Sequence, residues 1–336
     1  MRGIDVEPVS TWLAAHIPGA QAPFTFDLIA GGHSNLTYRV QGVDGAPLVL
    51  RRPPMGHVLA TAHDMAREHR IIAAVGATGV PVAPALGLCT DEEVNGAPFY
   101  VMGFVEGNVL DSPDKAALLP FDMRRRASER LVDVLATLHA VDVDAIGLGD
   151  LARRDGFLER QLKRWSRQWE SSKTRELPEI EEVERRLRKN PPEQRGVAIV
   201  HGDYRFGNML VSPQGDIRAV LDWELCTLGD ALADVGWMLV YWADPGEVRQ
   251  QNDPTSAGGF LTRRELVDRY ANLTGRDLSQ IDYYAAFAYW RSAIIGEGVY
   301  SRYLNGVMAD EEVDVARFGE NVARAAGLAL EAVSRL

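Results

Sequence analysis

Short apolar runs alternate with glycine-containing turns between residues 24 and 52. The order is FTFDLIA, GGHSN, LTYRVQ, VDGAP and LVLRR. Apolar runs rich in β-branched and aromatic residues and bounded by glycine turns are typical of strands that fold back on one another. The pattern therefore predicts a three-stranded antiparallel meander.

The next stretch changes from a strand-like to a helical pattern. Within residues 62–77, Met65, Ile72 and Val75 recur at helical spacing, with Glu68 beside them, and the stretch ends in glycines. Two further apolar runs, ALGLC and FYVMGFV, flank the polar turn TDEEVNG and read as strands. Together with the meander they predict a small antiparallel sheet carrying one helix.

Beyond residue 108 the apolar positions follow a helical period. Residues 124–140 carry leucine and valine at helical spacing, and residues 155–189 read as a more exposed helix rich in arginine and glutamate. From residue 230 the chain is again mostly helical, with a loop expected at 246–258. At 336 residues the chain exceeds the size of a usual single core. We therefore expect an α+β protein of two lobes, residues 1–105 and 106–336.

Composition and charge exclude several classes of protein. The net charge of −11 argues against a nucleic-acid-binding protein, which would show a clustered basic face. Cys89 and Cys226 lie far apart without the spacing of a disulfide framework or a zinc site. The first ten residues lack the apolar core of a signal peptide, and glycine and proline interrupt the uncharged stretch 71–89. We expect no membrane segment and a cytoplasmic location.

The octet HGDYRFGN, residues 201–208, concentrates the candidate chemistry. It is followed by the apolar run MLV, the turn SPQGD and a second apolar run that leads into Asp222. Because paired strands lie about 5 Å apart, Asn208 and Asp222 should be neighbours across a hairpin. Amide and carboxylate oxygens suit Mg²⁺, which completes its shell with water and substrate phosphates. Asp203 then lies one short loop from the metal, where it can accept a proton from an attacking hydroxyl or orient it.

The spacing His-x-Asp-x-x-x-x-Asn is that of the kinase catalytic loop. Here HGDYRFGNMLV and AVLDWELCTLGDALADVGW closely resemble the two signature segments of the aminoglycoside phosphotransferase and choline kinase group. The octet, LVLRRPP and the aromatic tract YYAAFAYWRSAIIGEGVYSRYLNG are most similar to the phosphotransferase-type domain fused to some acyl-CoA dehydrogenases. The resemblance covers residues 24–305, and the paired motifs are highly specific together.

The resemblance implies a bilobal protein-kinase-like fold. A small antiparallel sheet with one helix would form the N-lobe, and a larger, mainly helical C-lobe would carry the catalytic loop. ATP or GTP and Mg²⁺ would bind in the cleft, and the γ-phosphoryl group would pass to a hydroxyl of a small molecule. Asp203 is implied as the catalytic base, Arg205 as a contact to the transferred phosphoryl group, and Asn208 and Asp222 as the metal ligands.

Nucleotide-binding residues follow from the same resemblance. The turn GGHSN is similar to a phosphate-covering loop, in which main-chain N–H groups and a serine hydroxyl face phosphate oxygens. Kinases hold the phosphates with a lysine on the third strand, yet the first lysine of this chain is Lys115. Arg51 occupies the matching place, and Glu68 is its expected ion partner. Adenine is expected to bond to main chain near residues 102–105. The implied contacts are Gly32, His33, Ser34, Asn35, Arg51, Glu68, Met102, Gly103, Phe104 and Val105.

Structural interpretations compete with several of these roles. Asp203 and Asn208 are also residue types that cap turns, although the match with Asp222 favours the catalytic interpretation. His201 is expected to orient its loop through hydrogen bonds, and His139 to be a bonded core residue. The aromatic tract from residue 283 is expected to be a core helix. Three of its members are candidates for lining the acceptor pocket: Tyr284, Arg291 and Glu297.

The acceptor remains open at this stage. Similarity to the dehydrogenase-fused domains suggests a hydroxy acid or its coenzyme A thioester, whereas the acidic net charge would also suit an aminoglycoside or an amino alcohol. The alternative from another class is a pseudokinase that binds nucleotide without turnover, which Arg51 in place of lysine motivates. Retention of Asp203, Asn208 and Asp222 argues against it.

Overall fold

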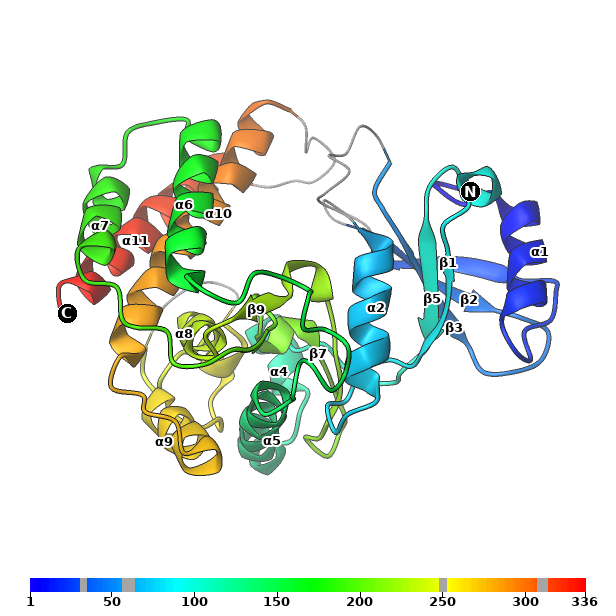
Figure 1. Cartoon of the computed structure of the whole chain (residues 1–336), viewed down its shortest axis with the longest axis horizontal. Coiled ribbons are helices and arrows are strands. Elements are labelled where there is room, and N and C mark those ends of the chain that lie inside the picture. The colour runs from blue at the N-terminus through cyan, green and yellow to red at the C-terminus, as the bar shows by residue number, and fades with distance from the viewer. Residues whose placement is uncertain (31–34, 56–63, 248–252, 307–313) are drawn as a thin grey trace.

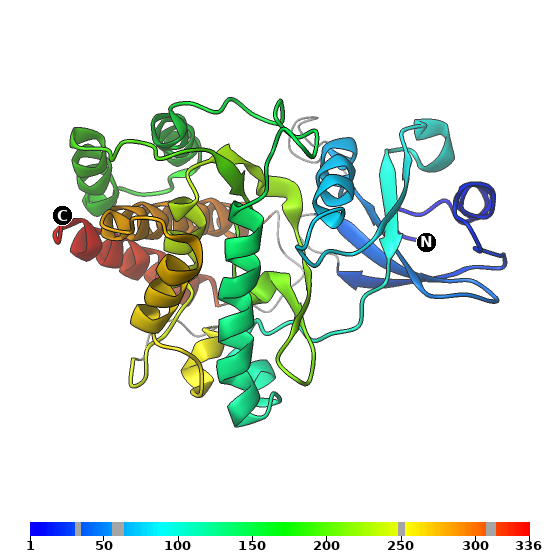
Figure 2. The ribbon, with the colours of Figure 1, turned by 60° about the horizontal axis from the view of Figure 1, so that its bottom comes forward.

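A five-stranded antiparallel sheet forms one end of the molecule and a set of helices forms the other (Figure 1). The computed structural model describes residues 1–30, 35–55, 64–247, 253–306 and 314–336. Three predicted phosphate-loop residues, Gly32, His33 and Ser34, lie outside the described residues. Figure 2 shows the same division from a second side. We call the two parts the sheet lobe and the helical lobe.

The sheet lobe confirms the predicted meander and its two additional strands. In the sheet the order is β1-β2-β3-β5-β4, with every neighbouring pair antiparallel. Strand β5 therefore inserts beside β3, so that Arg51 lies opposite Thr37 on one side and Tyr100 on the other. The strands are β1 (Thr25–Ala30), β2 (Leu36–Gln41), β3 (Leu48–Arg52), β4 (Ala85–Cys89) and β5 (Phe99–Gly103).

Alternating side chains divide the sheet between two helices. Leu50 and Val101 belong to a small core with α1 (Val6–His16), whereas Val49 and Tyr100 belong to the large core with α2 (Met65–Gly76). Helix α2 is the predicted one, and the Asp64 side chain caps it by accepting the amide of Arg67. Helix α1 and the short α3 (Glu92–Asn95) are additions to the predicted lobe.

The helical lobe begins after the linker that follows β5. The predicted helix at residues 155–189 is broken in two, because Pro178 disfavours helical geometry at Leu177 and starts a new helix. Helices α10 and α11 pack along each other, and the aromatic tract forms α10 as predicted. The helices are α4 (Pro113–Ala117), α5 (Phe121–His139), α6 (Phe157–Ser172), α7 (Pro178–Lys189), α8 (Leu232–Val240), α9 (Arg263–Thr274), α10 (Ile281–Leu304) and α11 (Val315–Val333).

Two short antiparallel ladders lie between these helices and the sheet lobe. Strand β6 (Ala198–Val200) pairs with β9 (Thr227–Gly229), and β7 (Met209–Val211) pairs with β8 (Ile217–Val220). The predicted hairpin after the octet is therefore confirmed. Single 3-10 turns occur at η1 (Phe206–Asn208), η2 (Trp223–Leu225) and η3 (Pro254–Ala257). Across the described part of the chain, no helix combines the length and apolar character needed to cross a bilayer.

Candidate active site

The two ladders bring together the loops that carry the candidate residues. One loop leaves β6 and enters β7, and the other leaves β8 and enters β9, so that each loop is anchored at both ends. The amide of Leu221 also donates to the main-chain oxygen of Asn208 at 2.8 Å. At the start of the first loop Gly202 has φ +86°, and a Cβ there would lie 2.8 Å from the carbonyl oxygen of Leu225. Only glycine allows this close approach of the two loops.

Three side chains hold the carboxylate of Asp203. The Asn208 amide donates to Oδ2 at 2.6 Å, and the Trp237 indole N–H donates to Oδ1 at 2.6 Å. Arg205 Nε donates to the same Oδ1 at 3.1 Å. Although burial opposes it, the neighbouring Asp203 raises the pKa of Arg205, which also stacks on Tyr241. The structure therefore brings Asp203, Arg205 and Asn208 together in a fixed arrangement.

Asn208 and Asp222 each keep one side-chain oxygen for a metal, Oδ1 of Asn208 and Oδ2 of Asp222, because Arg51 donates to Oδ1 of Asp222. The Asn208 amide nitrogen points to Asp203, and no donor among the described residues bonds to its Oδ1. The backbone of Asp222 has the left-handed conformation, with φ +64° and ψ +69°, which costs free energy for a residue other than glycine. No group of three or more acidic, histidine or cysteine side chains in the described ranges could hold a metal ion. A two-residue oxygen site fits Mg²⁺, which takes its remaining ligands from water and phosphates.

We call residues 201–208 the catalytic loop and residues 221–226 the metal loop, after their candidate roles. Arg51 of the sheet lobe reaches across to the metal loop. Its Nη2 lies 2.5 Å from Asp222 Oδ1 and 3.8 Å from Glu224, and its Nε lies 3.2 Å from Glu68. Glu68 is buried and also accepts from Asn35 at 3.0 Å and from Tyr100 at 3.1 Å. The predicted pair of Arg51 and Glu68 is therefore present, and Asn35 joins it. Burial, together with Asp222 and Glu224, favours a raised pKa for Glu68, while Arg51 opposes this.

An apolar cavity of about 370 Å³ opens beside Arg51 and Asp222. Sheet residues such as Val49 form one wall, and Leu210 and Leu221 of the helical lobe form the other. The four predicted base-contacting residues 102–105 all line it. The amides of Gly103 and Phe104, however, donate to the carbonyl oxygens of Pro84 and Pro47. Among the described residues, no acceptor bonds to the main-chain N–H of Val105. This N–H could therefore donate a hydrogen bond to a nucleotide base.

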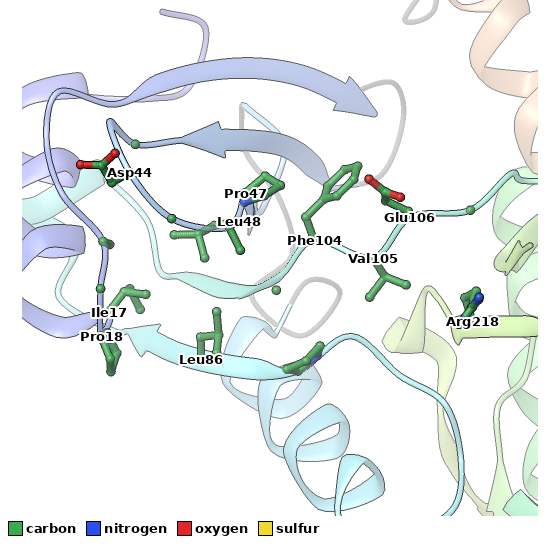
Figure 3. Close-up of a pocket in the computed structure, with 18 of the residues that line it drawn as sticks. Ile17, Pro18, Asp44, Pro47, Leu48, Leu86, Phe104, Val105, Glu106 and Arg218 are labelled. Carbon is green, nitrogen blue, oxygen red and sulfur yellow. The ribbon is translucent and has the colours of Figure 1, made fainter.

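A larger hollow of about 920 Å³ is lined in part by the same linker residues (Figure 3). Phe104 and Val105 line both this hollow and the cavity of about 370 Å³. The charged residues labelled around the hollow are Asp44, Glu106 and Arg218. No residue of the catalytic or metal loop lines it. The larger hollow is therefore not the candidate active site. The smaller cavity is the better candidate, because Arg51 and Asp222 line it.

Asp234 of α8 supports the catalytic loop from behind. Its carboxylate accepts the amides of His201 and Gly202 at 2.7 and 2.8 Å, and it faces His139 Nε2 at 3.2 Å. Burial alone would raise the pKa of Asp234, but the bond from His139 and the other donors lower it. His201 donates from Nε2 to the Leu221 carbonyl and accepts the Asp203 amide at Nδ1. The structural interpretations of His201 and His139 are thus confirmed.

We expect Asp234→Ala to destabilise the fold by about 3–5 kcal/mol, because two buried amides and His139 lose their partner. Denaturant unfolding of both proteins measures this difference. The exposed Asp268→Ala serves as the matched control, with an expected change within about 0.5 kcal/mol. A lowered pKa means that the contribution of Asp234 is present above its ordinary pKa and is lost as the pH falls through the lowered value. Equal stability of Asp234→Ala and the control would contradict the assignment.

The aromatic tract supplies one site residue and two structural ones. Arg291 Nη2 donates to the Gly202 carbonyl at 2.6 Å, and its guanidinium lies 4.0 Å from the Trp237 ring centroid. Glu297 is fully buried and bonds to Thr174, so it does not line the cleft. Tyr284 lines a separate hollow beside Asp230. Trp237 was not predicted as a site residue, because the signature segment that contains it reads as an ordinary apolar helix.

Comparison with known proteins agrees with this geometry. A model of the phosphotransferase enzyme family matches residues 25–269. Acyl-CoA dehydrogenase family member 10 from Mus musculus is 34% identical over 301 residues, which cover 88% of this chain and 28% of the relative. The chain therefore spans less than a third of that relative.

Two solved structures share the fold. A candidate aminoglycoside phosphotransferase from Ralstonia eutropha is 31% identical, with a TM-score of 0.82 over 98% of each chain. A thermostable mutant of aminoglycoside phosphotransferase APH(4)-Ia, in a ternary complex with AMP-PNP and hygromycin B, is 17% identical, with a TM-score of 0.64 over 97% of this chain and 98% of that chain. The chain belongs to the phosphotransferase enzyme family and is a phosphotransferase of bilobal kinase-like fold.

Proposed function

We propose that this protein transfers the γ-phosphoryl group of ATP or GTP to a hydroxyl of a small metabolite. The observation that carries the proposal is the convergence of Asp203, Asn208 and Asp222 beside the apolar cavity of about 370 Å³. Phosphoryl transfer asks mainly for positioning and charge neutralisation. We also propose that the boundary between the lobes follows Val105, which lines this cavity.

Asp203 is assigned as the group that accepts the proton of the attacking hydroxyl. Trp237 and Asn208 fix the two oxygens of its carboxylate, so that little reorganisation is needed during the reaction. Arg205 adds a fixed positive charge beside the same carboxylate and is assigned to the transferred phosphoryl group. The Val105 amide and the apolar walls are assigned to the base.

The metal assignment rests on the donor set at Asn208 and Asp222. When bound there, Mg²⁺ supplies charge neutralisation at the phosphates. Arg51 lies against Asp222 and is assigned to the phosphates as well, with Glu68 and Asn35 holding its position. Because Arg51 keeps the ion pair with Glu68, its replacement of lysine does not by itself support the pseudokinase alternative.

The relatives favour a hydroxy acid or a hydroxyacyl coenzyme A as the acceptor. The mouse relative is named as an acyl-CoA dehydrogenase family member, and this chain corresponds to only 28% of its length. The second candidate is an aminoglycoside or an amino alcohol, because one similar structure contains hygromycin B.

A screen for nucleoside diphosphate formation decides between these acceptors. It compares hydroxy acids, hydroxyacyl coenzyme A thioesters, amino alcohols and aminoglycosides in the presence of Mg²⁺, and detects ADP where ATP is the donor and GDP where GTP is the donor. We expect acceptor-dependent diphosphate formation with a member of the first two groups. Preference for an amino alcohol or an aminoglycoside would select the second candidate, and nucleotide binding without turnover of any acceptor would support a pseudokinase.

A further inference from the structure

Three arginines from different helices meet beside the catalytic and metal loops. Arg67 of α2 and Arg164 of α6 line a cleft of about 270 Å³ next to residues 224–227. Arg164 also lines a small hollow of about 20 Å³, together with Gly202 and Arg291 of α10. The cleft and the hollow share Arg164, Leu225 and Thr227, so the three arginines line two adjoining regions.

None of the three arginines forms an ion pair with a described carboxylate. Arg67 donates to the Cys226 carbonyl at 2.6 Å, and the described residues offer Arg164 no hydrogen bond. Arg291 is more than nine-tenths buried, and its Nε has no hydrogen-bond partner. Arg291 and Arg164 both stack on Trp165, at 4.9 and 5.2 Å from the ring centroid. Unpaired cations gathered in this way stabilise an incoming anion.

Three carboxylates also line the cleft, Asp64, Glu68 and Glu224, and their partners are groups other than the side chains of Arg67 and Arg164. Glu68 and Glu224 lie within 3.2 and 3.8 Å of Arg51, and Asp64 accepts the amide of Arg67. Desolvation lowers the pKa of Arg164, although part of its side chain is exposed, and the charge of Arg67 lowers it further. Burial lowers the pKa of Arg291 to about 10; Asp203 and Asp234 oppose this shift, whereas Arg164 adds to it. Arg67 and Arg164 therefore repel each other without an ion pair from the described residues, while the charge of Arg291 is partly offset by Asp203 and Asp234.

We propose that Arg67 and Arg164, with Arg291 behind them, bind an anionic group of the acceptor. The planar guanidinium group suits a carboxylate or a phosphate. A hydroxy acid would supply the carboxylate, and a coenzyme A thioester would supply the phosphate. This inference rests on the proposed function. It narrows the choice of acceptor to an anionic molecule, because the arginines would repel a cationic amino alcohol or aminoglycoside. It assigns specificity to residues outside the kinase-like motifs.

Anion binding is tested first without turnover. Thermal unfolding is followed with saturating Mg²⁺ and AMP-PNP, in sodium sulfate or in sodium chloride of equal ionic strength, for the wild type, Arg164→Gln and Arg167→Gln. Arg167 lies on the same helix, is exposed and lines neither region. We expect sulfate to raise the Tm of the wild type and of Arg167→Gln by a few degrees more than that of Arg164→Gln. Equal rises in all three proteins would overturn the proposal.

The acceptor is tested second, with hydroxybutyrate isomers, their coenzyme A thioesters, butanediol and choline. For the anionic acceptors we expect Arg164→Gln to raise KM about tenfold or more, Arg164→Lys to restore part of the loss, and KM for ATP to be unchanged. Preference for the free acid identifies a carboxylate, and preference for the thioester identifies a coenzyme A phosphate. Turnover of choline or butanediol that is insensitive to Arg164→Gln would overturn this inference and leave the phosphotransferase intact. Turnover of none of them would count against the proposed function, and the sulfate result would still decide the anion site.

Discussion

Asp203→Ala is expected to lower kcat by about a hundred- to ten-thousand-fold while nucleotide binding is retained. The substitution removes the proposed proton acceptor, and positioned acid–base groups contribute rate factors of about this size. Asp203 does not line the cavity of about 370 Å³ that is proposed to hold the nucleotide, so the affinity for nucleotide should change little. Single-turnover phosphoryl transfer and nucleotide titration measure the two effects separately.

Asp268→Ala is a suitable control for this experiment, since Asp268 is exposed and pairs with Arg264 of the same helix α9. Thermal unfolding of Asp203→Ala should also be recorded, because Trp237 and Arg205 lose their common partner. Equal turnover numbers for Asp203→Ala and the wild type would exclude Asp203 as the base.

Asp222→Ala is expected to remove the metal-dependent part of stabilisation by nucleotide. A ligand at about a hundred times its Kd stabilises a protein by about 2.7 kcal/mol, which is readily seen as a shift in Tm. For the wild type, AMP-PNP should stabilise more strongly with Mg²⁺ than with a chelator. For Asp222→Ala the two curves should coincide, and phosphoryl transfer should be lost.

Asp216→Ala provides the matched comparison, because Asp216 lies at the opposite end of the same strand, directly before β8, and pairs with Arg126 at the surface. This variant should keep the full metal dependence. If Asp222→Ala responded to Mg²⁺ as strongly as Asp216→Ala, the proposed metal site would be wrong.

Local patterns were sufficient to predict the parts of the site that lie on one hairpin. Asn208 and Asp222 flank two short apolar runs joined by a polar turn, so their proximity follows from strand pairing. The pair of Arg51 and Glu68 was predicted from the resemblance to kinases, and the structure adds Asn35 and Tyr100 to it.

Contacts between distant helices could not be predicted in this way. Trp237 reaches Asp203 from a helix whose other residues, apart from Asp234, are apolar. No periodicity distinguishes an indole that packs from one that also donates a hydrogen bond. The clustering of Arg67, Arg164 and Arg291 depends on how three helices pack, which the sequence pattern of each helix does not contain. Helix α1 was missed because only Val9 and Leu13 of it are buried.

The contact of Arg51 with Asp222 joins the two lobes, whereas Asn208 and Asp222 belong to one hairpin. A hinge motion at the linker would therefore separate the guanidinium from the metal loop and leave the distance between the two proposed metal ligands unchanged. Under the proposed function, spent nucleotide could then depart by lobe opening alone, and the next nucleotide would meet a proposed metal site that needs no rebuilding between turnovers.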